Sequence, residues 1–158
     1  MPKHHTVHPV AHRAQHMFDL VADIERYPEF VPLCQSLKLR TRREKAGREI
    51  LVADMTVGYK AIRETLTCQV VLNRKDLSIA VSYVDGPFKY LKNDWRFEPS
   101  ETQGIAHEAH CNVVFDLDYE FKSRTLAMVM GAMFDQAFSR FVKAFEQRAD
   151  TLYGMDAA

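Results

Sequence analysis

The chain has 158 residues, and its 21 Lys and Arg are balanced by 21 Asp and Glu, so the formal net charge is zero. This length fits one domain that buries its own core without disulfides or metals, and the charge balance excludes a global attraction to nucleic acid or anionic lipid. The three cysteines lack Cys-x-x-Cys spacing, which argues against a disulfide framework or zinc site and favours a reducing compartment. No apolar run has the length of a signal peptide or membrane span, so we expect a cytoplasmic protein, with peripheral contact at the inner membrane left open.

The chain begins with a predicted edge strand followed by a short helix. Residues 3–12 alternate loosely around Pro9, a pattern tolerated in an edge strand but not in a helix. From Ala14 the apolar residues recur at helical spacing until Pro28 ends the run. Residues 27–34 carry two prolines and two aromatics, so we expect an apolar loop or broken helical turn that packs inward.

Residues 36–121 alternate strand-like runs with turn signals and fit six strands. In the run 109–121 apolar and polar side chains alternate with Val114 as the exception, which predicts a strand with one buried face. Residues 123–153 place apolar side chains three or four apart and predict one helix, roughly 45 Å long at about 1.5 Å per residue. The order β-α-α-β6-α predicts a single α+β domain over 1–154, with a curved seven-stranded antiparallel sheet around the long C-terminal helix and a disordered tail at 155–158.

Five polar or amphipathic residues fall on strand faces that are otherwise apolar. Glu64 is the most informative, because a carboxylate facing an apolar interior costs several kcal/mol unless it is paired. It is either half of a structural ion pair or a ligand-facing group, and both remain open. Tyr59, Tyr83, Asn93 and Trp95 are each either a hydrogen-bonding partner for a ligand head group or a core residue satisfied by backbone.

The C-terminal helix carries Met128, Met130 and Met133, three of the chain's seven methionines. Methionine adapts its shape, which suits a surface that must accommodate a flexible ligand. A stripe of methionine and phenylalanine at helical spacing is also typical of an ordinary core, so the pattern alone leaves both interpretations open.

The seven histidines do not predict a metal site. Spacing by four would align His4, His8, His12 and His16 only on a continuous helix, which Pro9 forbids. His107 and His110 are an odd number apart and lie on opposite faces of a strand. No Walker loop, G-x-G-x-x-G or nucleophile elbow occurs either, so we expect no cofactor.

A basic cluster surrounds the first predicted hairpin turn. It could contact RNA phosphates or anionic lipid head groups, or form a solvated hairpin face. Its members are Lys38, Arg40, Arg42, Arg43, Lys45 and Arg48.

Segments spread over nearly the whole chain carry a family resemblance: 27–34, 57–59 with Glu64 following, 85–88 leading to 95–97, 115–121, and 144–149 running to 152–154. In this order they resemble the coenzyme Q-binding, polyketide cyclase-like START-domain family, which includes the ribosome association toxin RatA. The resemblance implies a helix-grip (START-like, Bet v 1-like) fold with a hydrophobic tunnel between the sheet and the C-terminal helix.

The resemblance also implies a function, which is binding of ubiquinone or a similar isoprenoid lipid by a chaperone that supports respiratory electron transport. The alternative is a RatA-type toxin that binds the large ribosomal subunit and blocks subunit association. A cyclase or dehydratase activity ranks last, and DNA is not an expected partner. The expected ligand-binding residues are Phe30, Val31, Pro32, Met55, Tyr59, Glu64, Tyr83, Phe88, Asn93, Trp95, Phe115, Met130, Met133, Phe134 and Phe138.

Overall fold

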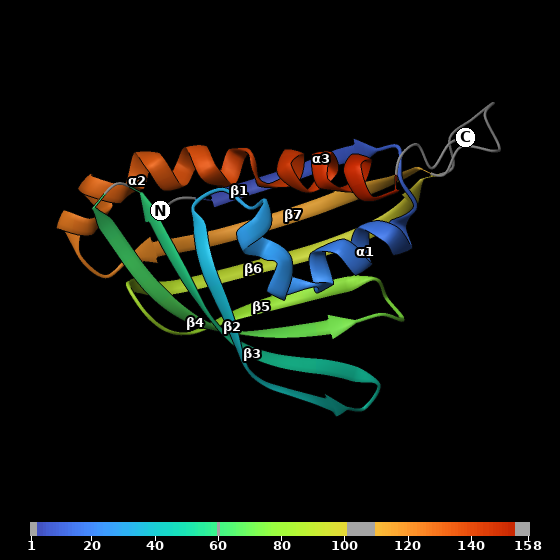
Figure 1. The fold of residues 1–158 in the computed structure, drawn as a ribbon, viewed down its shortest axis with the longest axis horizontal. Helices are drawn as coiled ribbons and strands as arrows, with labels where there is room; N and C mark the ends of the chain where they lie inside the picture. The colour runs from blue at the N-terminus through green and yellow to red at the C-terminus, as the bar shows by residue number, and fades with distance from the viewer. Residues whose placement is uncertain (1–2, 60, 101–109, 154–158) are drawn as a thin grey trace.

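Seven antiparallel strands form one sheet in the order β1-β7-β6-β5-β4-β3-β2, so consecutive strands from β2 to β7 are hairpin neighbours and β1 returns beside β7. The computed structural model describes residues 3–59, 61–100 and 110–153, leaving aside the side chains of residues 59, 100 and 110. Figure 1 shows the sheet twisting strongly between its two edges. The strands are β1 (Lys3–Val10), β2 (Cys34–Lys45), β3 (Arg48–Tyr59), β4 (Ile62–Asn73), β5 (Ser78–Asp85), β6 (Phe88–Ser100) and β7 (His110–Phe121).

The predicted alternation of the strands is confirmed by their register. In β7 the side chains of Val113, Phe115, Leu117 and Tyr119 are buried, and only Val114 adds a buried residue out of step. The N-terminal strand is also confirmed as an edge strand, where the missing N–H of a proline is tolerated. The prediction of a tail at 155–158 falls outside the described residues.

The helices cover one face of the sheet (Figure 1). They are α1 (Ala14–Ala22), the 3-10 helix η1 (Ile24–Glu29), α2 (Arg124–Ser139) and α3 (Phe141–Tyr153). The helix expected from Ala14 to Pro28 is therefore shorter than predicted, because the chain leaves helical geometry at Asp23. Pro28 is accommodated inside η1.

The prediction of one continuous C-terminal helix is wrong, because the helix breaks at Arg140. Arg140 has φ −103° and ψ −4°, and its N–H turns back to the carbonyls of Ala137 and Phe138. The Ser139 hydroxyl donates to the Gln136 carbonyl at 2.8 Å, which occupies an acceptor of the last turn of α2. The break divides the helical layer into two segments: α2, which begins at the cap that Ser123 provides, and α3, which packs against α1.

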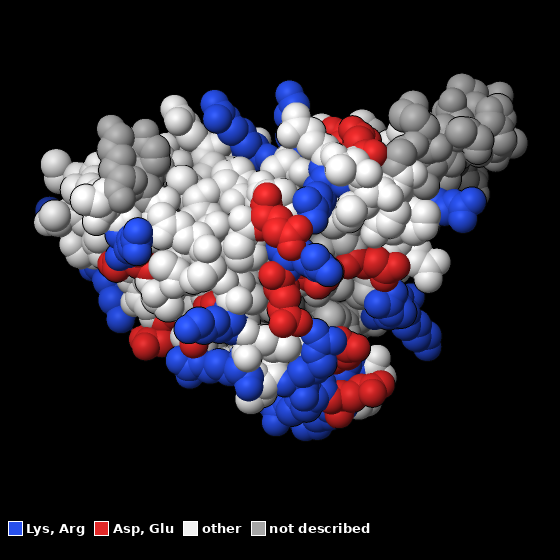
Figure 2. All heavy atoms as spheres, viewed as in Figure 1, with Lys and Arg blue, Asp and Glu red and all other residues white. Residues whose placement is uncertain are grey.

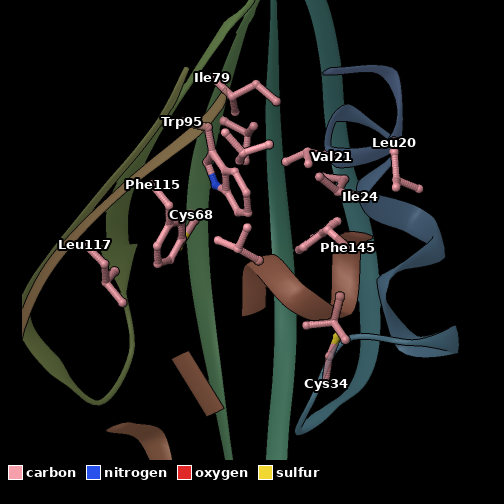
Figure 3. Packing of buried hydrophobic residues seen from close by; sticks show 14 of the residues in the cluster. Leu20, Val21, Ile24, Cys34, Cys68, Ile79, Trp95, Phe115, Leu117 and Phe145 are labelled. Carbon is pink, nitrogen blue, oxygen red and sulfur yellow. The ribbon is translucent and has the colours of Figure 1, made fainter. Parts of the chain in front are cut away.

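The main core lies between the sheet and this helical layer. Figure 3 shows side chains from the sheet meeting side chains from α1, η1 and α3. The indole of Trp95 lies 4.7 Å from the ring of Phe115 and 5.1 Å from that of Phe145, measured between ring centroids. The second contact packs α3 edge-on against β6, and this is the helix-grip arrangement that the family resemblance implies.

Candidate functional site: an apolar cavity and an adjoining groove

An apolar cavity continues from this core toward α2. It has an inner lobe near Trp95 and Phe145 and an outer lobe near Phe88 and Phe134, each of about 90 Å³. Figure 3 shows the residues at the inner end, where Trp95 comes from β6 of the sheet and Phe145 from α3 of the helical layer. The two lobes are adjacent, and they share the lining residues Val31, Met55, Leu66, Cys68, Val81, Asn93 and Phe141.

The few polar groups of the cavity wall are already engaged. The amide of Asn93 accepts from the indole Nε1 of Trp95 at 2.9 Å and donates to the Asp116 carbonyl at 2.8 Å. The Tyr27 hydroxyl donates to the Val21 carbonyl, and burial raises the pKa of Tyr27. Burial also raises the pKa of Cys34 to about 11 and that of Cys68 to about 12. A molecule in this space would therefore meet an almost wholly apolar surface at neutral pH.

A surface groove adjoins the outer lobe and shares Pro32, Leu33 and Ala137 with it, and we call this groove the mouth of the cavity. Leu33 has φ +66°, in the left-handed region that non-glycine residues seldom occupy. It is held there by its carbonyl, which accepts from the N–H of Gly58 at 3.0 Å. The groove has a volume of about 610 Å³ and is lined by Pro32, Leu33, Ile62, Val129, Ala132, Met133, Gln136, Ala137 and Arg140.

Most residues expected to bind ligand meet at this cavity or its mouth. Trp95 lines the inner lobe, and Met133 lines the mouth groove. The others line the outer lobe, and they are Val31, Pro32, Met55, Phe88, Asn93, Phe115, Phe134 and Phe138.

Other expected residues lie away from the cavity lining. Phe30 packs on Phe145 beneath the Arg148 guanidinium, and Met130 is a fully buried core residue of α2. The Tyr83 hydroxyl accepts from the Phe88 N–H at 3.0 Å, so this tyrosine bridges β5 and β6. The side chain of Tyr59 is outside the described residues.

Glu64 lies at the beginning of β4, opposite Val57 of the outer lobe, with its side chain half-buried. Within the described part of the chain no ion pair or hydrogen bond involves Glu64. Its strand neighbour Ile62 lines the mouth groove. The carboxylate therefore lies at the rim of the cavity rather than inside it.

Several lining residues were not expected from the sequence. Leu66, Cys68, Val81, Leu91 and Leu117 share strand faces with expected residues, so the same alternation could have indicated them. Tyr27 lies in η1, Leu33 directly before β2 and Cys34 at the first residue of β2, a stretch of the chain where no periodicity indicates which side chains point inward.

The basic cluster occupies the exposed β2–β3 hairpin, where Figure 2 shows Lys and Arg gathered near the lower edge of the molecule. Arg40 pairs with Asp54 at 2.6 Å, and Arg42 lies within 3.7 Å of Glu25 and Glu49. The hydrogen bonds from Thr67 and Arg40 hold the pKa of Asp54 below its usual value. No described ion pair involves Arg43, Lys45 or Arg48.

The N-terminal histidines pair with carboxylates of the C-terminal helices. The Nε2 atom of His4 lies 3.1 Å from the carboxylate of Asp135. The Nε2 atom of His8 lies 2.9 Å from that of Glu146, and the Nε2 atom of His12 lies 2.6 Å from that of Asp150. Each histidine thus faces a different carboxylate, and the described residues contain no group of three or more ligands that could hold a metal ion. The hydrogen bonds of His8 and His12 fasten α3 to the N-terminal segment, whereas His4 lies near Asp135 of α2 without a described hydrogen bond.

Comparisons with known proteins agree with this architecture. The model of a family described as polyketide cyclase / dehydrase and lipid transport matches residues 10–146. The ribosome association toxin RatA of Vibrio cholerae is 37% identical over 145 residues, covering 92% of this chain and 93% of that protein. The mitochondrial coenzyme Q-binding protein COQ10 homolog B of Xenopus laevis is 28% identical over 141 residues, covering 89% of this chain and 54% of that protein.

A solved structure shares the fold. The aromatase/cyclase Zhui from Streptomyces superimposes with a TM-score of 0.72 at 16% identity, covering 94% of each chain.

Within the described residues, no helix has the length and apolar content needed to cross a membrane.

Proposed function

Because the chain belongs to the polyketide cyclase / dehydrase and lipid transport family, we propose that it binds ubiquinone or a similar isoprenoid lipid in its apolar cavity. In this role it is a lipid chaperone that supports respiratory electron transport. The name of the COQ10 relative gives the ligand class. The observation that carries the proposal is the cavity wall, whose polar groups are engaged with one another and leave an apolar surface.

The binding energy in this proposal comes from the isoprenoid tail. Apolar area removed from water contributes about 25 cal/mol per Å². Because the polar groups of the wall are already hydrogen-bonded within the protein, covering them with an apolar tail leaves no hydrogen bond unmade. The two lobes are smaller than the roughly 300–1,000 Å³ of ordinary ligand pockets, so the ligand must widen the space. We expect α2 to move outward about the break at Arg140, because α2 supplies Phe134, Ala137 and Phe138 to the outer lobe.

The head group belongs at the rim in this proposal. Glu64 lies beside the mouth, where a carboxylate keeps access to water, and it is the group we expect nearest the quinone ring. Tyr83 is a weaker candidate for this contact, because its hydroxyl is held by the N–H of Phe88.

Lipid extraction and mass spectrometry of the protein purified from its native host test the proposal. The variant Val81→Phe places a ring in both lobes, while Val84→Phe on the same strand adds a ring at a side chain that is 58% exposed. We expect an isoprenoid quinone with the wild type and Val84→Phe and little with Val81→Phe. Recovery of no isoprenoid lipid from the wild type, or equal recovery from Val81→Phe, would contradict the proposal.

A second candidate function is association with the large ribosomal subunit to block subunit joining, which the name of the RatA relative suggests. The observation that favours it is the β2–β3 hairpin, where Arg43, Lys45 and Arg48 are exposed and in no described ion pair. Cations of this kind bind RNA phosphates by releasing counterions.

Overexpression followed by ribosome profiles on sucrose gradients tests this second function. A toxin of this type lowers the ratio of intact ribosomes to free subunits, and replacing Arg43, Lys45 and Arg48 together by Gln should restore the ratio. Val81→Phe serves as the control, because it alters the cavity and leaves the hairpin intact. An unchanged ratio on wild-type overexpression would rule out the ribosomal function.

A cyclase or dehydratase would need an acid and a base inside the cavity. The titratable side chains that line the two lobes are Tyr27, Cys34 and Cys68, and burial raises the pKa of each. All three are therefore protonated at neutral pH, so the lining favours binding over proton transfer.

A further inference from the structure

The mouth of the cavity is flanked by an exposed apolar face of α2. The side chain of Met128 is 84% exposed and that of Val129 is 52% exposed, and Ala132 follows one turn later on the same face. Val129 and Ala132 also line the mouth groove, opposite Pro32 and Leu33. Figure 2 shows a mostly uncharged surface on this side of the molecule, with charged residues at its margins. An apolar surface of this kind on a protein of zero net charge marks a contact site.

The charges around this face are mixed, with Arg140, Lys122 and Arg124 on the positive side and Glu64, two positions from the groove residue Ile62, on the negative side. Arg140 is the one charged residue among the described lining residues of the groove. Lys122 and Arg124 are exposed where α2 begins, and no described ion pair involves any of these three cations. The one acidic residue of α2, Asp135, is 65% exposed one turn after Ala132 and lies 3.1 Å from His4, so it adds a negative charge at the edge of this face.

We propose that the mouth face, made of Met128, Val129, Ala132, Pro32 and Leu33, docks on the surface of a lipid bilayer that contains anionic lipids. The apolar side chains enter the interface between head groups and acyl chains, and the cations contact lipid phosphates. A lipid surface fits better than RNA, because burial of Met128 and Val129 needs an apolar partner. The inference rests on the proposed function in one respect, that ligand enters through this mouth.

Flotation of the full chain with quinone-free vesicles tests the docking surface. Vesicles of phosphatidylcholine with phosphatidylglycerol are compared with vesicles of phosphatidylcholine alone, at low and high salt. Val129→Glu has a closely matched control in Val7→Glu, since Val7 is 53% exposed on the opposite, outer face of the sheet. Arg140→Gln is matched by Lys75→Gln, an exposed cation in the β4–β5 turn with no described ion pair.

We expect binding to the anionic vesicles that weakens with salt. Val129→Glu should lower the affinity at least about tenfold and Arg140→Gln roughly fivefold, with both controls unchanged. Circular dichroism melting identifies a variant that has lost its fold. If the wild type does not float, if Val7→Glu matches Val129→Glu, or if Val129→Glu impairs only binding to ribosomal subunits, the inference is wrong. Because the vesicles contain no quinone, these outcomes are independent of whether the cavity binds one.

Discussion

The indole Nε1 of Trp95 donates to the side-chain oxygen of Asn93 at 2.9 Å, two positions earlier on the same strand face. The amide nitrogen of Asn93 in turn donates to the Asp116 carbonyl of β7 at 2.8 Å. Two polar residues that could have met a ligand head group therefore satisfy each other and the backbone. This relationship allows a cavity with polar residues in its wall to present an apolar surface.

Replacing Asn93 by Ala should destabilise the fold by about 2 kcal/mol, because the Trp95 N–H and the Asp116 carbonyl lose their described side-chain partner in a poorly hydrated site. Asn73→Ala is the matched control, since the described hydrogen bonds of the Asn73 side chain join it to Asp76 at the exposed end of β4, and it should cost less than about 1 kcal/mol. Urea unfolding followed by tryptophan fluorescence measures both. Equal losses would mean that the Asn93 network adds no stability beyond an ordinary surface bond.

The turn before β6 requires glycine at position 86. Gly86 has φ +143°, and a Cβ added there would lie 2.9 Å from the Cα of Leu66. Gly86→Ala should therefore destabilise by about 3 kcal/mol, from backbone strain together with displacement of β4. Gly47 also has a positive φ, of +79°, but nothing lies within 4 Å of its added Cβ, so Gly47→Ala should cost about 1 kcal/mol. Thermal unfolding of the two variants separates backbone strain, which both share, from the collision with Leu66, which only Gly86→Ala has. If Gly86→Ala loses no more stability than Gly47→Ala, the collision makes no contribution.

The fastening of α3 to the N-terminal segment can be tested at His12. This imidazole is 2% exposed and lies 2.6 Å from the Asp150 carboxylate, whereas His5 pairs with Asp116 at a side chain that is 65% exposed. His12→Ala should cost about 2 kcal/mol, because it leaves a void and removes the hydrogen bond of a buried imidazole. His5→Ala should stay within about 1 kcal/mol. Hydrogen exchange of α3 should accelerate only in the first variant, and unchanged exchange would refute the role of His12 as a fastener.

Much of the fold could be predicted because each strand buries one face. The alternation in β7 and the apolar register of β3 to β6 follow directly from the sheet's single covered side. The break at Arg140 could not be predicted in this way. Ala137, Phe141 and Phe145 keep helical spacing across it, because the apolar pattern reports which side chains are buried and is insensitive to one interrupted backbone turn.

Strand alternation predicts the part of the candidate site that regular structure supplies, and the family resemblance adds Val31 and Pro32 from the segment before β2. Met55, Asn93 and Phe115 follow strand alternation into the cavity. Leu33 does not, because its inward position depends on a left-handed backbone that no sequence pattern marks at a leucine. Tyr83 was placed on the correct strand face, but its hydroxyl is taken by a backbone N–H across the β5–β6 turn, a contact that register alone cannot reveal.

The buried thiols predict a decline of stability at alkaline pH. Burial raises the pKa of Cys34 to about 11, and those of Cys68 and Cys111 to about 12. The unfolded chain loses these protons from about pH 8.5, while the folded chain keeps them. The unfolded state therefore binds fewer protons, and the free energy of unfolding should fall as pH rises above about 8.5, by on the order of 1 kcal/mol per thiol at pH 9.5. Urea unfolding between pH 7 and 9.5 measures how steeply the free energy of unfolding falls with pH. This dependence should become weaker when all three cysteines are replaced by Ala.

The same cysteines can report opening of the cavity. Cys34 and Cys68 line it, whereas Cys111 is fully buried in β7 away from both lobes. Alkylation at pH 7.5 needs both a thiolate, which the raised pKa values make scarce, and access, which the closed cavity denies. If α2 moves outward to admit ligand, Cys34 and Cys68 should label faster than Cys111, and added ubiquinone should slow these two sites alone. Peptide mapping by mass spectrometry gives the three rates. Labelling of all three cysteines at one common rate would indicate global unfolding instead, because local movement of α2 exposes the cavity without exposing β7.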